Sequence, residues 1–244
     1  MVYAHNMKKM SEGLMRGGDI STARVITRFI LGFGLIAAIL FGTAGTFNWP
    51  EAWTYIIVQF TYSLRMTLWL KKHDPQLLKS RMRVLNPSMQ QRDKLFALLF
   101  TLLFIPFLLL PGLDAIRFGW SDMPLAIEII GFAGVSWALW LILRVMQENS
   151  FASPIVEIQR ERNHQVIDSG PYAYVRHPMY TGFITMNICL PLALGSLWTL
   201  PVGLLLSSIF LIRIRFEEQT LQDELQGYSD YCQRVSYRLV PGVW

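Results

Sequence analysis

Two polar stretches at the edges of apolar runs hold the residues best suited to chemistry. The stretch GPYAYVRHPMYTG contains Arg176, His177 and Tyr180, and the pair Glu217 and Glu218 follows the next two apolar runs. A pair of carboxylates is a suitable counter-charge for a cation, and backbone donors at the start of a helix can receive an anion. The two stretches therefore define a candidate site, provided that the fold brings them together.

A tight helical hairpin is the element that would bring them together. Pro178 suits the first position of a helix, and a helix from there to Leu194 is roughly 25 Å long at about 1.5 Å per residue. A second helix from Leu197 needs about 20 residues to cross roughly 30 Å of hydrocarbon, and so ends near Phe216 or the two glutamates. We therefore expect the glutamates to return to the depth of RHPMY and to contact it.

A third contributor is the loop VEIQRERNHQVIDSG, which supplies Gln159, His164 and a short apolar stretch over residues 165–167. The spacing of His164, His177 and the two glutamates matches no metal-binding pattern, so no metal site is predicted. The sequence also has no GxGxxG between a strand and a helix, no P-loop, no HExxH and no GxSxG. Rossmann-type nucleotide binding, phosphate cradling, zinc peptidase chemistry and the common esterase arrangement thus lack their markers.

These polar residues also have purely structural interpretations. Arg176 would then mark the inner membrane face, and the neighbouring tyrosines would be interfacial anchors. Glu217 and Glu218 would pair with Arg213 or with another basic residue nearby. Arg65 lies within an apolar run, where a charge is costly and usually faces a partner or a water-filled cavity. Alternatively, its side chain extends along the helix to the membrane surface. The sequence leaves both interpretations of Arg65 open.

The composition indicates an integral membrane protein. Of the 244 residues, 52% are hydrophobic and 16% are charged, against about 25% charged residues in ordinary soluble domains. The net charge of +5 does not indicate a nucleic-acid partner, because the basic residues cluster beside apolar segments, as they do in cytoplasmic loops. The expected surroundings are membrane lipids.

Six apolar runs fit membrane-spanning helices, either alone or with a few flanking residues. The Lys and Arg residues concentrate before the first run and between the second and the third, so six spans with both termini in the cytoplasm satisfy the positive-inside rule. In a bacterium this membrane would be the cytoplasmic one. The predicted fold is an all-α integral membrane protein whose C-terminal hairpin carries a site facing the cytoplasm. The runs cover residues 28–47, 52–70, 95–110, 125–143, 183–194 and 197–212.

The C-terminal region, residues 151–244, carries a combination of motifs in a fixed order. IQRERNHQVIDSGPYAYVRHPMYTG and a hairpin are followed by RIRFEEQTLQDELQGYSDYCQRVSYRLVPGVW. With its RHPxYxG, double glutamate and GYxxY elements, this region resembles the isoprenylcysteine carboxyl methyltransferase family and its bacterial relatives. The resemblance implies an integral membrane methyltransferase that binds S-adenosylmethionine at the cytoplasmic face. The rest of the chain divides into a cytoplasmic segment, residues 1–24, and a four-helix membrane region, residues 25–150.

The resemblance also implies which residues contact the cofactor and the acceptor. In the family an arginine just before the glutamates faces the substrate, and Arg213 and Arg215 both fall within one residue of its place. Either of them could hold an anionic acceptor, and a carboxylate acceptor needs no general base. The implied cofactor-binding residues are Gln159, His164, Gln165, Val166, Ile167, Tyr172, His177, Pro178, Met179, Tyr180, Glu217 and Glu218.

The acceptor and two alternative functions remain open at this point. A lipophilic acceptor, such as a prenylated cysteine carboxylate, would reach the site laterally from the lipid, and the oligomeric state is not predicted. The closest alternative is an NADPH-dependent membrane reductase of the sterol reductase type, which has an RHPxYxG-like element but no double glutamate at that helix end. A small transporter with Arg65 on its pathway is the second alternative, although no internal repeat is visible.

Overall fold

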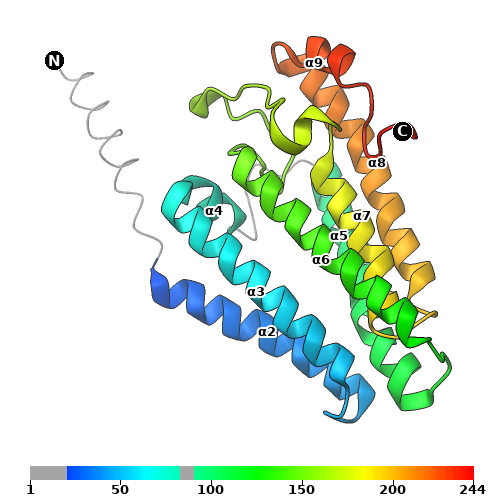
Figure 1. Cartoon of the computed structure of the whole chain (residues 1–244). Helices are drawn as coiled ribbons and strands as arrows, with labels where there is room; N and C mark the ends of the chain where they lie inside the picture. The colour runs from blue at the N-terminus through cyan, green and yellow to red at the C-terminus, as the bar shows by residue number, and fades with distance from the viewer. Residues whose placement is uncertain (1–20, 83–90) are drawn as a thin grey trace. The chain divides into compact units, whose positions relative to one another are not determined.

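The computed structural model describes residues 21–82 and 91–244. The chain divides into two units, residues 1–34 and 35–244. Throughout the described residues the regular secondary structure is helical (Figure 1), as the sequence predicted.

Part of the predicted orientation rests on the N-terminal segment, residues 1–24. Its basic residues Lys8, Lys9 and Arg16 lie outside the described residues, as does the middle of the basic loop, residues 83–90. The orientation of the chain in the membrane therefore stays a prediction.

Long helices form at each of the six predicted apolar runs. The α7 helix begins at Pro178, the position predicted for the helix start. The long helices are α2 (Thr22–Ala44), α3 (Pro50–His73), α5 (Gln91–Pro111), α6 (Leu125–Glu148), α7 (Pro178–Ala193) and α8 (Leu200–Glu224). Shorter helical elements connect them: α4 (Pro75–Arg81), η1 (Gly112–Phe118), η2 (Arg160–Arg162), η3 (Gly170–Ala173) and α9 (Tyr228–Arg234).

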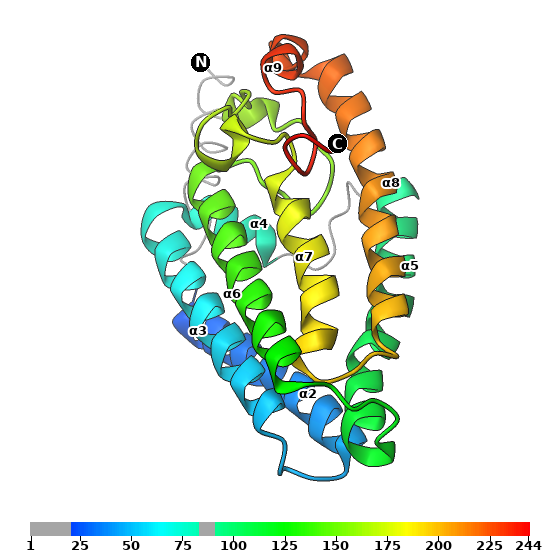
Figure 2. The same ribbon diagram turned by 45° about the vertical axis from the view of Figure 1, so that its right-hand side comes forward.

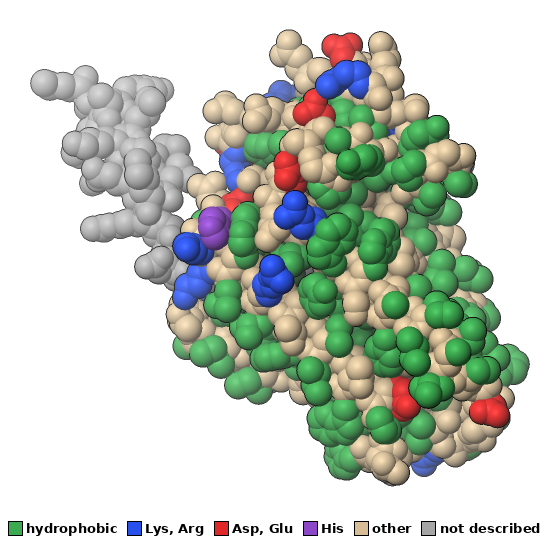
Figure 3. Space-filling view, in the orientation of Figure 1, with side chains coloured by type: hydrophobic (Ala, Val, Ile, Leu, Met, Phe, Trp, Pro, Cys, Tyr) green, Lys and Arg blue, Asp and Glu red, His purple; other side chains and the backbone are tan. Residues whose placement is uncertain are grey.

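Three of the described helices are long and apolar enough to cross a membrane, namely α2, α6 and the continuous stretch Gln91–Phe118 formed by α5 and η1. The α7 helix has only 16 residues, and α3 and α8 carry more polar residues. On the face shown in Figure 3, charged side chains gather in the upper part and at the lower tip, and the band between them is mainly apolar. These features support an integral membrane protein, whereas the count of six spans stays a prediction.

Helices α6, α7 and α8 lie side by side (Figure 2) and approach one another closely at glycines. A Cβ atom added at Gly131 of α6 would lie 2.4 Å from the backbone nitrogen of Ala193 in α7. A Cβ atom at Gly203 of α8 would lie 2.1 Å from the carbonyl oxygen of Asn187 in α7. Small residues at such contacts let helix backbones pack closely in a membrane. The spacing of these three helices therefore depends on glycine.

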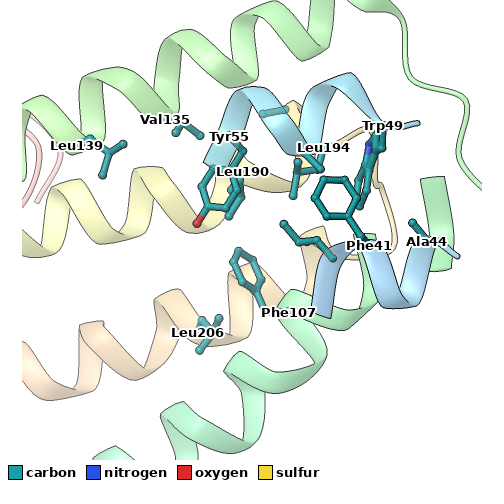
Figure 4. Packing of buried hydrophobic residues seen from close by; sticks show 13 residues of the cluster. Phe41, Ala44, Trp49, Tyr55, Phe107, Val135, Leu139, Leu190, Leu194 and Leu206 are labelled. Carbon is teal, nitrogen blue, oxygen red and sulfur yellow. The ribbon is translucent and has the colours of Figure 1, made fainter. Parts of the chain in front are cut away.

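The main hydrophobic core joins α3, α5, α6, α7 and α8 with the end of α2 (Figure 4). Trp49, at the start of α3, is fully buried and packs edge-to-face against Phe41, with ring centroids 6.5 Å apart. Leu190 of α7 and Leu194, the residue after α7, belong to this cluster together with Val135 of α6. The core fixes the end of the bundle that lies far from α9.

The α7–α8 turn is held by Asp114 of η1, whose side chain is completely buried. Its Oδ2 atom accepts hydrogen bonds from the Ser196 hydroxyl at 2.6 Å, the Ser121 hydroxyl at 2.8 Å and the Trp198 backbone N–H at 3.1 Å. A π-helical turn such as η1 displaces the backbone from the regular α-helical path. Here it brings a carboxylate from the end of α5 to the tip of the hairpin.

Candidate functional site

The hairpin brings the two predicted polar stretches into direct contact at the end of the bundle nearest α9. The Arg176 Nε atom lies 2.7 Å from the Glu218 carboxylate, and His177 Nε2 lies 3.3 Å from the same carboxylate. The Tyr180 hydroxyl donates a hydrogen bond to Glu217. The contact expected from helix lengths is therefore confirmed.

Glu218 is a buried structural carboxylate. In addition to Arg176 and His177, it accepts a 2.7 Å hydrogen bond from Arg238 in the C-terminal tail. Burial alone would raise the pKa of Glu218, but the hydrogen bonds from His177, Arg238 and Arg176 outweigh it and lower this pKa from 4.5 to about 2. Both carboxylate oxygens thus bind protein cations, and Glu218 fastens the tail to the start of α7.

The tail also pairs with the same motif through its backbone. The backbone N–H groups of Arg176 and His177 donate to the carbonyls of Tyr237 and Arg238, each at 2.9 Å. The Arg176 guanidinium adds a 2.7 Å hydrogen bond to the Val235 carbonyl. Arg176 therefore holds the C-terminal tail against the start of α7. The sequence suggested either a ligand-binding residue or a marker of the inner membrane face, and this structural role is neither of the two.

A polar cavity of about 110 Å³ opens between the loop before η3, the start of α7, the end of α8 and α9. Glu217 lines this cavity, whereas Glu218 does not. Ten of the residues predicted to bind ligands line it together: His164, Gln165, Val166, Ile167, Tyr172, His177, Met179, Tyr180, Arg213 and Glu217. Gln159, Pro178, Arg215 and Glu218 are not among its lining residues.

Gln159 lies behind the cavity wall, where it holds the loop. Its side-chain N–H donates to the Phe151 carbonyl at 3.1 Å, and its oxygen accepts a 2.7 Å hydrogen bond from Arg162. The Gln159 backbone N–H in turn donates to His164 Nδ1 at 3.3 Å. The neutral His164 ring accordingly carries its proton on Nε2.

The His164 ring lines the cavity and is held in place by stacking. Its ring stacks on Phe151 with centroids 4.3 Å apart. Burial and the nearby charge of Arg162 both lower the pKa of His164, which favours the neutral ring. Tyr172, which also lines the cavity, accepts a 2.9 Å hydrogen bond from Asn149, and burial raises its pKa.

Of the two candidate arginines, Arg213 faces the site and Arg215 is exposed. Arg213 donates to the Tyr180 hydroxyl at 3.0 Å and to the Pro154 carbonyl at 2.7 Å, and it pairs with Asp93 at 3.2 Å. Its guanidinium also lies over the Phe96 ring, 4.2 Å from the centroid. These contacts hold the Arg213 guanidinium in one position beside Tyr180.

A second, larger cavity of about 470 Å³ lies among α3, α5, α6, α7 and α8. Its wall is largely aromatic and aliphatic, so we call it the apolar cavity. It shares Ser153, Met179, Tyr180 and Arg213 with the polar cavity. The two cavities therefore adjoin at the start of α7.

Two further arginines, Arg81 and Arg65, have different surroundings. Arg81 of α4 lines the apolar cavity, although nothing in the sequence distinguished it from the other basic residues of its loop. Arg65 is exposed and lines neither cavity, which agrees with a side chain that extends towards the membrane surface.

Comparison with known proteins agrees with the motifs. The family model described as the isoprenylcysteine carboxyl methyltransferase (ICMT) family matches residues 138–223. The chain is 34% identical over 93 residues to a protein-S-isoprenylcysteine O-methyltransferase of Schizosaccharomyces pombe, covering 37% of this chain and 39% of that protein. It is 29% identical over 125 residues to protein-S-isoprenylcysteine O-methyltransferase B of Arabidopsis thaliana, covering 44% of this chain and 64% of that protein.

A sterol reductase is also similar to part of this chain. The Delta(14)-sterol reductase of Mus musculus is 35% identical over 83 residues, which are 33% of this chain and 20% of that protein. The matches thus span between 20% and 64% of the length of these curated relatives.

Similarity of fold extends beyond the matched motifs. A solved structure described as the eukaryotic intramembrane Ras methyltransferase ICMT superposes with a TM-score of 0.56 at 21% identity, over 88% of this chain and 75% of that chain. Over residues 138–223, where the RHPxYxG element meets the double glutamate, this chain is thus similar to the isoprenylcysteine carboxyl methyltransferase family.

Proposed function

We propose that this chain is an integral membrane methyltransferase that transfers a methyl group from S-adenosylmethionine to a lipophilic acceptor. The observation that supports this most directly is the pair of adjoining cavities, one polar and one apolar, with Met179, Tyr180 and Arg213 in the shared wall. A transfer between a charged cofactor and a lipid-soluble acceptor needs two such compartments that meet at the reacting atoms.

The polar cavity has the donor set that S-adenosylmethionine requires. The Glu217 carboxylate is a counter-charge for the sulfonium and ammonium groups, and the start of α7 at Met179 favours the cofactor carboxylate. When bound, the cofactor supplies an electrophilic methyl group. The residues that would hold it are His164, Gln165, Val166, Ile167, Tyr172, His177, Met179, Tyr180 and Glu217.

The other three predicted cofactor residues would act from behind the cavity. Gln159 holds the loop that carries His164, Pro178 sets the start of α7, and Glu218 fastens the tail. In this assignment only Glu217 of the double glutamate contacts the cofactor.

The apolar cavity would bind the body of the acceptor, with Arg213 beside its nucleophile. A carboxylate acceptor, as in isoprenylcysteine carboxyl methylation, is already ionised at neutral pH and needs no general base. The protein then has to align the two reactants and exclude water. The contacts of Arg213 to Tyr180 and Asp93 keep it in place for that task.

We also propose six spans with both termini in the cytoplasm. The α7–α8 hairpin then places the polar cavity at the cytoplasmic surface, where S-adenosylmethionine is available. The charges of the described loops fit this orientation, since Lys71 and Lys72 end α3, whereas Arg117 is the one basic residue in the loop after α5.

Calorimetry on the detergent-solubilised full chain tests the cofactor, and methyl transfer to an S-prenylated cysteine with a free carboxylate tests the reaction. We expect S-adenosylmethionine to bind, NADPH to give no heat, and the carboxylate to become a methyl ester detectable by mass spectrometry. Binding of NADPH without binding of S-adenosylmethionine would instead support the reductase alternative.

A further inference from the structure

The apolar cavity contains an uncompensated positive charge. Among its described lining residues are two arginines, Arg81 and Arg213, and no carboxylate. Arg213 is paired with Asp93 at 3.2 Å. For Arg81, the described residues provide a backbone carbonyl, Ala152, at 2.9 Å and a thioether sulfur, Met179, at 3.3 Å, but no acidic partner.

Arg81 is held on a fixed element. Its helix, α4, starts at Asp74, whose side chain caps the Leu77 backbone N–H at 2.9 Å, and Pro75 occupies the first helical position. Leu77 and Leu78 are buried, which anchors this short helix to the bundle. The Arg81 guanidinium therefore points into the cavity from a defined place.

The guanidinium also has donors to spare. An arginine carries five N–H donors, and the Ala152 carbonyl and the Met179 sulfur occupy two of them. Burial lowers the pKa of Arg81 from 12.5 to about 10, and the nearby charge of Arg213 contributes, yet at this pKa the group is still a cation at neutral pH. Arg81 is half-buried, and a cation that is partly removed from water without a carboxylate partner is costly unless an anion joins it.

We propose that Arg81 binds the anionic head group of the methyl acceptor and so selects amphiphilic carboxylates, an inference that rests on the proposed methyltransferase function. The contact between Arg81 and Met179 places this cation at the wall that the two cavities share. An acceptor with its chain in the apolar cavity would thus have its carboxylate between Arg81 and Arg213.

The acceptor loses its negative charge in the reaction, so Arg81 would favour both binding of the acid and release of the ester. A carboxylate oxygen forms a bond to the methyl carbon while the sulfonium S–C bond breaks and its electron pair stays on sulfur; no proton moves. The acceptor is an anion before this step and a neutral ester after it. Arg81 therefore binds the acid more strongly than the product.

The test compares an S-prenylated cysteine acid with its methyl ester on the full chain in detergent. Wild type should bind the acid roughly 10- to 100-fold more tightly than the ester, the range expected for a charge-assisted hydrogen bond. Arg81→Gln should reduce that ratio about 10-fold, since Arg213 remains, and should raise the KM for the acid, with the affinity for S-adenosylmethionine unchanged. Arg81→Lys should recover part of the ratio.

Lys79→Gln is the matched control, because it removes one positive charge from the same helix but lines neither cavity. It should bind acid and ester as wild type does. If Arg81→Gln keeps the wild-type ratio, or loses S-adenosylmethionine binding, Arg81 does not recognise the acceptor. If Arg81→Gln does not fold, Arg81→Lys decides by the same ratio. A wild-type chain that binds no S-adenosylmethionine contradicts the proposed function itself.

Discussion

Glu217 and Glu218 are adjacent in the sequence but have different surroundings. Glu218 is buried among Arg176, His177 and Arg238, whereas Glu217 lines the polar cavity and accepts a hydrogen bond from Tyr180. Successive residues on a helix point in directions about 100° apart, which allows one to stabilise the fold and the other to face a ligand.

Glu217→Gln should weaken binding of S-adenosylmethionine roughly 10- to 100-fold, because a charge-assisted contact is lost while the shape of the side chain is kept. Calorimetry measures this, and Glu224→Gln is the control, since Glu224 lies on the same helix in an exposed pair with Arg160. Equal affinity in wild type and Glu217→Gln would contradict the assignment of Glu217 to the cofactor.

Glu218 should make the stability of the protein depend on pH in the acid range. Its pKa is about 2 in the folded chain and 4.5 ordinarily, so the folded state binds fewer protons between these values. The stabilisation is complete above pH 4.5 and is lost as the pH falls towards 2. Its size is on the order of 3 kcal/mol, at about 1.4 kcal/mol per unit of pKa.

Thermal unfolding of wild type and Glu218→Gln across this range provides the measurement. The unfolding midpoint of wild type should exceed that of the variant at neutral pH, and the two should converge near pH 2. A constant difference between the two midpoints at every pH would show that the Glu218 charge is not what stabilises the tail.

The helical hairpin was the element most accessible to prediction. Pro178 marked the start of α7, and helix lengths alone brought the RHPMY residues to the depth of the glutamates. The end of α8 was harder, because the helix continues to Glu224, well past the apolar run. Hydropathy does not detect this polar part, whose helical conformation is stabilised by the buried partners of Arg213 and Glu218.

Close packing within the hairpin should make Gly203 intolerant of a side chain. Gly203→Ala puts a Cβ atom 2.1 Å from the Asn187 carbonyl oxygen, so α7 and α8 must move apart, at a typical cost of about 1 to 3 kcal/mol. Gly42→Ala is the control, since an added Cβ there has no neighbour within 4 Å. In detergent, the unfolding midpoint should fall for Gly203→Ala only; an unchanged midpoint would mean that the hairpin is looser than described.

At the scale of the whole molecule, the fold extends well beyond the recognisable motifs. The family match covers residues 138–223, yet the superposition on a solved structure covers 88% of the chain. The sequence predicted the helices and most of the polar cavity because those residues are close together in two motifs. It could not predict the apolar cavity or Arg81, because these depend on how α3, α4 and α5 pack against α7.

The orientation of the whole chain can be checked with single cysteines after Cys189 and Cys232 are changed to serine. Asp122 lies exposed before α6 and Asp230 lies exposed on α9. A cysteine at position 122 should react with a membrane-impermeant maleimide in intact cells, and one at position 230 only after permeabilisation. The reverse pattern would place α9, and the polar cavity beside it, outside the cell.

The wall shared by the two cavities has a consequence for inhibition. In the proposed function the cofactor fills the polar cavity and the acceptor fills the apolar cavity, so both can be bound at the same time, with Met179 and Tyr180 between them. A single molecule that links a nucleoside thioether to a lipid chain could then occupy both cavities at once. Such a bisubstrate compound gains affinity from the link itself, because the second half binds at a high effective concentration.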